Sequence, residues 1–154
     1  YLVGCGYFIL ASTKLKGLDT NLLTLLIYLF VWTNNCFAYI FGKNWGKNLL
    51  FPSISPKKTW EGFWGGGLSC LILGLALMFL DTELPKWNFP LLAIVIVLTA
   101  TVGDLIQSKF KREAKVKDSG SLIPGHGGFF DRMDSVLYTA PFVYLILKLS
   151  EYVS

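Results

Sequence analysis

Apolar residues along this chain come in long blocks that are separated by short polar segments. Five runs contain no charged residue: 1–13, 20–42, 62–80, 87–103 and 135–147. As an α-helix the run 62–80 would be roughly 28 Å long, close to the thickness of the hydrocarbon core of a bilayer. The last run can extend past Lys148, because the aliphatic stem of a lysine can carry its charge to the interface. The pattern predicts an all-α fold, a polytopic bundle of transmembrane helices.

The composition agrees with a membrane protein and argues against a soluble domain. Charged residues make up 16% of the chain and hydrophobic residues 53%, whereas soluble domains average about 25% charged residues. The three cysteines lie in apolar runs without paired spacing, which excludes a zinc site or a disulfide framework. No repeat or interdomain linker is visible, and the chain begins at Tyr1 without Met. We therefore expect residues 1–154 to form a single membrane-embedded domain, a fragment that lacks N-terminal transmembrane helices.

The charges indicate how the helices are oriented in the membrane. Two strongly basic loops, 43–61 and 108–132, are separated by two predicted spans and so lie on the same side, whereas the link 81–86 with its two acidic residues lies opposite. The positive-inside rule places both basic loops in the cytoplasm. Because the net charge of +4 is concentrated in these loops, we expect anionic lipid or a phosphate-bearing substrate as the partner and no nucleic acid.

The segment from Ser108 to Asp134 combines basic residues, aspartates and a loop rich in glycine and proline. It contains six basic residues, Lys109, Lys111, Arg112, Lys115, Lys117 and Arg132, together with the aspartates Asp118, Asp131 and Asp134. Aspartates beside cationic side chains and a glycine-rich loop are typical of sites that hold Mg²⁺ and a polyphosphate together. The alternative, a solvated positive loop between two spans, explains the lysines but neither the carboxylates nor the glycines.

Further acidic side chains flank this segment. If the run that ends at Gly103 is helical, Asp104 and Ser108 are i,i+4 neighbours on one face, and Asp131 and Asp134 are similarly i,i+3 in the next helix. Asp104 has an alternative interpretation as an interface residue whose charge reaches water.

The other basic loop, 43–61, contains a possible helix start. Ser55 before Pro56 resembles an N-cap followed by proline at the first helical position. This would place Lys57, Lys58 and Thr59 in a first turn whose free N–H groups favour an anion. As a plain membrane anchor, the loop would need only its lysines.

The span 20–42 carries two adjacent amides, Asn34 and Asn35. Polar groups inside a span are costly unless they are paired or face a cavity. They either hydrogen-bond a neighbouring helix or face a site, and the sequence leaves both possibilities open.

The segment 108–134 resembles the signature of the phosphatidate cytidylyltransferase (CDP-diacylglycerol synthase) family. The matching positions are Ser108, Lys111, Arg112, Lys117, Asp118, His126, Gly127, Gly128, Asp131, Arg132 and Asp134. The resemblance extends to Gly103-Asp104 and to a second block from Ser55 to Gly62. One position departs from it: where the family has Asn-Asp, this chain has Asn34-Asn35.

The resemblance implies a catalytic membrane domain that converts CTP and phosphatidate to CDP-diacylglycerol and pyrophosphate, and suggests a homodimer. It implies that Asp104, Asp131 and Asp134 hold Mg²⁺, alone or with a second cation, next to Ser108. Lys111, Arg112 and Lys117 would neutralise the triphosphate, and Lys57 and Lys58 would meet the lipid phosphate or the nucleotide. The remaining positions implied in substrate binding are Ser55, Thr59, Asp118, His126, Gly127, Gly128 and Arg132. His126 would contact phosphate or order the loop, because an anionic attacking phosphate needs no strong base.

Three alternatives stay open at this stage. A CTP-dependent lipid kinase would share the nucleotide, and an inactive homologue would explain Asn35. A cation pathway through the membrane would use Asp104 with the amides of the span 20–42, although the polar groups gather at one face.

Overall fold

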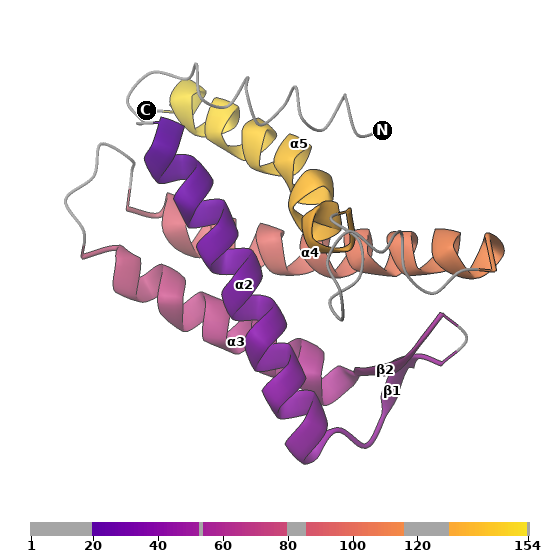
Figure 1. Ribbon diagram of the computed structural model, residues 1–154. Helices are drawn as coiled ribbons and strands as arrows, with labels where there is room; N and C mark the ends of the chain where they lie inside the picture. Colours follow the sequence, from indigo (N-terminus) through magenta and orange to yellow (C-terminus); the bar gives the residue numbers. More distant parts are fainter. Residues whose placement is uncertain (1–19, 53, 80–85, 116–129, 154) are drawn as a thin grey trace.

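The computed structural model describes residues 20–52, 54–79, 86–115 and 130–153, which form four helices and one hairpin (Figure 1). The elements are α2 (Thr20–Trp45), β1 (Leu49–Phe51), β2 (Ser55–Thr59), α3 (Trp60–Leu77), α4 (Asn88–Glu113) and α5 (Phe130–Val153). The runs 20–42 and 135–147 lie within α2 and α5, and the runs 62–80 and 87–103 overlap α3 and α4, so the predicted helical fold is confirmed. The run 1–13 lies outside the described residues.

Three of the helices are long and apolar enough to cross a membrane: Leu22–Trp45, Trp60–Leu77 and Asn88–Glu113. The apolar part of α5, Ser135–Ser150, is shorter. Large hydrophobic side chains on the outer faces of these helices are exposed, among them Leu25, Ile72 and Leu98. Such a surface suits lipid and not water. The chain is part of a multi-pass membrane protein.

Helix α4 continues ten residues beyond the charge-free run that predicted it, ending at Glu113. The extension carries good helix formers, and the ammonium group of Lys109 lies 3.8 Å from the carboxylate of Glu113, one turn later. The bounds predicted for the basic loop, 108–132, were therefore wrong at both ends. Its first residues belong to α4, which ends at Glu113, and its last residues belong to α5, which begins at Phe130.

Small residues set the contact between α2 and α3. A methyl group added at Gly62 would lie 2.6 Å from the carbonyl oxygen of Ala38, and one at Gly66 would lie 2.7 Å from the side-chain oxygen of Asn34. Glycines at these positions allow the two backbones to approach closely. The contact joins the end of α2 to the start of α3.

Contacts between successive helices show that each pair is antiparallel. Gly74 of α3 packs against Phe89 of α4. Along α4 and α5 the amide of Asn88 donates to the hydroxyl of Ser150 at 2.8 Å, and the hydroxyls of Thr99 and Thr139 lie 3.2 Å apart. As a result the end of α2, the start of α3, the end of α4 and the start of α5 share one end of the bundle.

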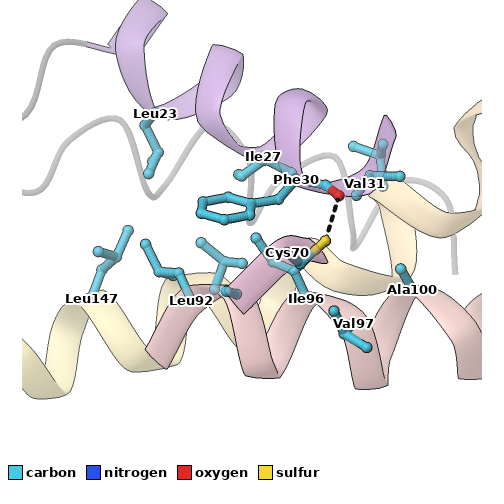
Figure 2. Packing of buried hydrophobic residues seen from close by; sticks show 13 residues of the cluster. Leu23, Ile27, Phe30, Val31, Cys70, Leu92, Ile96, Val97, Ala100 and Leu147 are labelled. Atoms are coloured by element: carbon cyan, nitrogen blue, oxygen red, sulfur yellow. Dashed lines mark hydrogen bonds between the residues drawn. The ribbon is translucent and has the colours of Figure 1, made fainter. Parts of the chain in front are cut away.

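A buried hydrophobic cluster lies between the helices (Figure 2). Phe30 of α2 points into it, above Leu92 and Ile96 of α4, and the thiol of Cys70 on α3 donates to the carbonyl oxygen of Phe30 at 3.3 Å. This core holds α2, α3 and α4 together and fixes where their polar ends meet.

Candidate active site

The block from Ser55 to Thr59 is a strand and not the first turn of a helix. It pairs antiparallel with Leu49–Phe51, and α3 begins only at Trp60. The predicted N-cap at Ser55 was therefore wrong. The actual cap is Thr59, whose hydroxyl accepts from the N–H of Gly62 at 3.2 Å. Pro56, which lacks an N–H, is tolerated in the strand because a two-stranded hairpin has only edges.

A second contact fixes the base of the hairpin to α3. The carboxylate of Glu61 accepts from the backbone N–H of Asn48 at 3.1 Å and from its side-chain amide at 2.9 Å. The N–H of Trp60 donates to the carbonyl oxygen of Asn48 at 2.9 Å. These bonds hold β2 in a set position beside the helix, and they orient the lysines that β2 carries.

A cavity of about 410 Å³ lies between the hairpin, the end of α2, the start of α3 and the polar part of α4. Its lining residues are Asn34, Asn35, Ala38, Tyr39, Gly42, Lys43, Leu50, Ser55, Lys57, Lys58, Thr59, Gly62, Phe63, Thr101 and Asp104. All four positions of the hairpin block that were predicted to bind substrate are among them. The structure thus brings Ser55, Lys57, Lys58 and Thr59 together with Asp104.

Asp104 forms the centre of the polar contacts. Its carboxylate makes an ion pair with the ammonium group of Lys58, and both side chains are partly buried. The hydroxyl of Ser108 donates to the other carboxylate oxygen at 3.4 Å. The expected i,i+4 relation of Asp104 and Ser108 on one helix face is confirmed, and the ion pair connects residues 46 positions apart in the chain.

The two adjacent amides of α2 have different surroundings. Asn34 is buried against α3, and its side-chain oxygen, close to Gly66, has no hydrogen-bond partner among the described residues. Asn35 is exposed and lines the cavity. Although both reach the lining, Asn34 is mainly a packing residue, whereas Asn35 shares open space with Asp104.

The described lining of the cavity is cationic. It contains three lysines, Lys43, Lys57 and Lys58, and one carboxylate, Asp104. The ammonium group of Lys43 also lies 5.9 Å from the centre of the Tyr39 ring. A partly enclosed site with this balance favours an anionic ligand.

Other residues that were predicted to form the site lie away from the cavity lining or outside the described residues. Lys111 and Arg112 belong to the last turns of α4, and neither is among the residues that line the cavity. Lys117, Asp118, His126, Gly127 and Gly128 lie outside the described residues. Their assignment to the site stays a prediction.

Asp131, Arg132 and Asp134 lie in the first turns of α5, and only their backbone is described. The contacts Asn88–Ser150, Thr99–Thr139 and Gly103–Tyr138 fix an antiparallel register between α4 and α5. Continued by one turn, this register brings the backbone at positions 131 and 134 toward the Asp104–Ser108 turn of α4.

The part of the cavity that the structure describes offers oxygen atoms to a cation. These are the carboxylate of Asp104 and the side-chain amide of Asn35, and oxygen donors are the ligands that Mg²⁺ prefers. Among the described residues, no three histidine, cysteine or acidic side chains lie together in a group that could hold a metal ion. The donors present fit a hard cation, and the predicted three-aspartate site depends on α5.

Sequence reasoning missed the contribution of α2 beyond its amides. Tyr39 and Lys43 line the cavity one and two turns after Asn35, a spacing of four residues that places all three on one helix face. Thr101, three residues before Asp104, lines it as well. The signal was a polar stripe continuing from Asn35 to the end of the span.

Comparison with known proteins agrees with the motifs that meet in this cavity. Residues 1–150 match the model of the cytidylyltransferase family. Phosphatidate cytidylyltransferases of Staphylococcus saprophyticus, Staphylococcus epidermidis and Staphylococcus aureus are each 42% identical to it over 146 residues, which is 94% of this chain and 55% of theirs. The chain thus spans about half the length of these curated relatives. On the extent of the family match, it belongs to the cytidylyltransferase family.

Proposed function

We propose that this chain forms the catalytic part of a membrane enzyme that transfers a cytidylyl group from CTP to phosphatidate. The products would be CDP-diacylglycerol and pyrophosphate. Family membership and the names of the Staphylococcus relatives support this reaction. The expectation that residues 1–154 act as one catalytic domain, and that the protein forms a homodimer, stays a prediction.

The observation that carries the proposal is the ion pair between Lys58 and Asp104. It joins the two separated blocks of the resemblance, one on the hairpin and one on α4, at a single cavity lined by further lysines. A lysine that only anchors the chain at the membrane, or an aspartate whose charge only reaches water at the interface, would not need to contact the other residue. A site for a polyphosphate that is neutralised by cations from several elements would require it.

In the proposed reaction an anionic oxygen of the phosphatidate phosphate attacks the α-phosphorus of CTP. The bond from that phosphorus to the β-phosphate bridging oxygen breaks, and pyrophosphate leaves with the electron pair. Because the attacking oxygen is already ionised, the site needs to align two anions and offset their repulsion. Lys43, Lys57 and Lys58 would do this from the cavity wall.

Asp104, with Asp131 and Asp134 from α5, would hold Mg²⁺. A bound Mg²⁺ would offset charge on the phosphate oxygens in the transition state. Ser108 would orient the carboxylate of Asp104 through the hydrogen bond at 3.4 Å. Lys58, which makes an ion pair with Asp104, would face the anionic ligand from the same part of the cavity wall.

We further propose that the cavity faces the cytoplasm. Lys43, Lys47, Lys57, Lys111 and Arg112 all lie at the end of the bundle where α2 and α4 finish. Such an excess of basic residues next to the spans marks the cytoplasmic side. CTP would then reach the site from the compartment where it is made.

The test is a product assay with CTP labelled at the α-phosphate, phosphatidate in detergent micelles and Mg²⁺. Label in the lipid fraction together with released pyrophosphate would support the proposal, and omitting phosphatidate provides the control. Phosphorylated lipid with CDP would indicate a lipid kinase. If neither product forms while the protein stays folded, the proposed activity is wrong.

A further inference from the structure

The hairpin segment, residues 46–59, presents an apolar outer surface. Leu49 and Phe51 on β1 are each 46% exposed, whereas Leu50 between them lines the cavity. Neighbouring side chains of a strand point to opposite faces. One face of β1 therefore borders the cavity, and the other displays two large hydrophobic side chains.

Tryptophans stand at both ends of the hairpin segment. Trp45 is the last residue of α2 and is 61% exposed, and Trp60 is the first residue of α3 and is 46% exposed. Exposed tryptophan at the end of a membrane span is characteristic of the membrane–water interface. Because both belong to spans that end at the same side of the bundle, the hairpin segment between them begins and ends at interface depth.

The described charged side chains around the hairpin segment are mostly basic. Lys47 is exposed and lies outside the cavity lining, and Lys43 and Lys57 lie close by in the chain. The acidic side chain of this region, Glu61, is engaged by Asn48. Anionic headgroups attract such cations when they are held near the membrane surface.

We propose that the outer surface of the hairpin segment lies in the headgroup layer of the membrane, with Leu49 and Phe51 inserted among the upper parts of the lipid chains. The occupant of this surface is lipid, because the hairpin segment lies between two tryptophans, Trp45 and Trp60, that are exposed where the adjoining spans end, and Trp64, one turn into α3, is exposed as well. The hairpin would then carry its other face, the cavity wall, at the depth of a lipid phosphate. The inference rests on the membrane spans and not on the proposed reaction.

Collision measurements on spin-labelled protein in liposomes test this placement. Nitroxides would be attached to Leu49→Cys or Phe51→Cys in a background whose three native cysteines are replaced by alanine. Ile72→Cys, exposed in the middle of α3, serves as the lipid control, and Ala114→Cys, exposed after α4, serves as the aqueous control. For each label the accessibility to oxygen is compared with the accessibility to a water-soluble nickel complex.

We expect labels at 49 and 51 to be several-fold less accessible to the nickel complex than the label at 114, and nearly as accessible to oxygen as the label at 72. Adding phosphatidylglycerol to phosphatidylcholine vesicles should increase the immersion of the label at 51, and Lys47→Gln should weaken that increase. Accessibility matching position 114 would place the hairpin in water and overturn the proposal. Protection from both reagents would mean that protein covers the hairpin, which would also overturn it. Neither measurement requires turnover, so a failure here is distinguishable from a failure of the proposed reaction.

Discussion

At the scale of single residues, the site depends on the side chains that the carboxylate of Asp104 contacts. Its carboxylate contacts Lys58 from the hairpin and Ser108 from the next turn of α4. The side chain is only partly buried, so the pair is weak as a stabilising contact because water screens it. Its importance lies in placing opposite charges at the cavity wall.

Asp104→Asn keeps the shape of the side chain and removes its charge. We expect metal-dependent turnover to fall by about 10²-fold or more, because a preorganised charge at the reacting phosphates is lost. Membrane insertion and thermal unfolding should change little. Initial rates at saturating Mg²⁺ check this, with Glu113→Gln, which removes an exposed acid one and a half turns beyond Ser108, as the control. Near-normal turnover of Asp104→Asn would contradict the metal-site assignment, and Asp131→Asn should behave as Asp104→Asn does.

The adjacent amides allow a paired experiment. Asn35 lines the cavity, so Asn35→Asp should lower the Mg²⁺ concentration needed for half-maximal rate and raise turnover at limiting metal. Asn34 is buried against α3, so Asn34→Asp should destabilise the protein, by about 2.5–3.5 kcal/mol if the charge behaves as one at the centre of a span. Mg²⁺ titrations of the rate and unfolding in detergent separate the two effects. If Asn35→Asp loses stability without any change in metal dependence, Asn35 does not act at the site.

At the scale of elements, the α2–α3 contact depends on the absence of side chains at particular positions. Gly66→Ala should destabilise the protein by about 1–3 kcal/mol, because the added methyl would lie 2.7 Å from the Asn34 side-chain oxygen and overpack the contact. Gly67→Ala is the matched control, since its methyl would lie 3.5 Å from the nearest atom, on Val97. Unfolding of both variants in detergent measures the difference. Equal effects would mean that helix propensity and not the α2–α3 contact determines the result.

The helices could be predicted from the sequence because their signal is local. Blocks of about twenty apolar residues identify spans without knowledge of any partner. The hairpin could not be predicted in this way, because Ser55-Pro56 resembles a helix start and the competing strand requires Leu49–Phe51 as a partner. The sequence carries no local mark of that pairing.

Part of the candidate site could be predicted from the sequence, and part of it could not. The resemblance identified Asp104, Lys58 and their neighbours, and the i,i+4 spacing identified Ser108. Asn34 and Asn35 have different surroundings because of where α3 packs against α2. The pattern of apolar and polar residues along the chain does not show where two helices make contact. Lys43 was missed because a lysine at the end of a span has an ordinary explanation as a membrane anchor.

At the scale of the whole molecule, antiparallel packing of successive helices predicts the membrane topology. Asn44→Cys, at the end of α2, and Ala114→Cys, after the end of α4, should react with a membrane-impermeant thiol reagent from the same side. A cysteine in 82–85 should react from the other side. Sealed vesicles of known orientation, with the native cysteines replaced, provide the measurement. Labelling of positions 44 and 114 from opposite sides would refute the arrangement of spans.

The unequal lengths of α3 and α4 have a mechanical consequence. At 18 and 26 residues, the two helices are about 27 Å and 39 Å long. The last ten residues of α4, which are rich in charged side chains, extend out of a hydrocarbon layer about 30 Å thick, whereas α3 has no such extension. Because the two helices meet the interface at different points along their length, a thicker or thinner bilayer changes the tilt of one helix more than that of the other. Asp104 is carried by the long helix and Lys58 by the strand that leads into the short one, so a change in relative tilt acts on the gap between them. We expect the proposed transfer reaction to be fastest in lipids of one acyl length, which would couple the supply of new phospholipid to the thickness of the membrane that receives it.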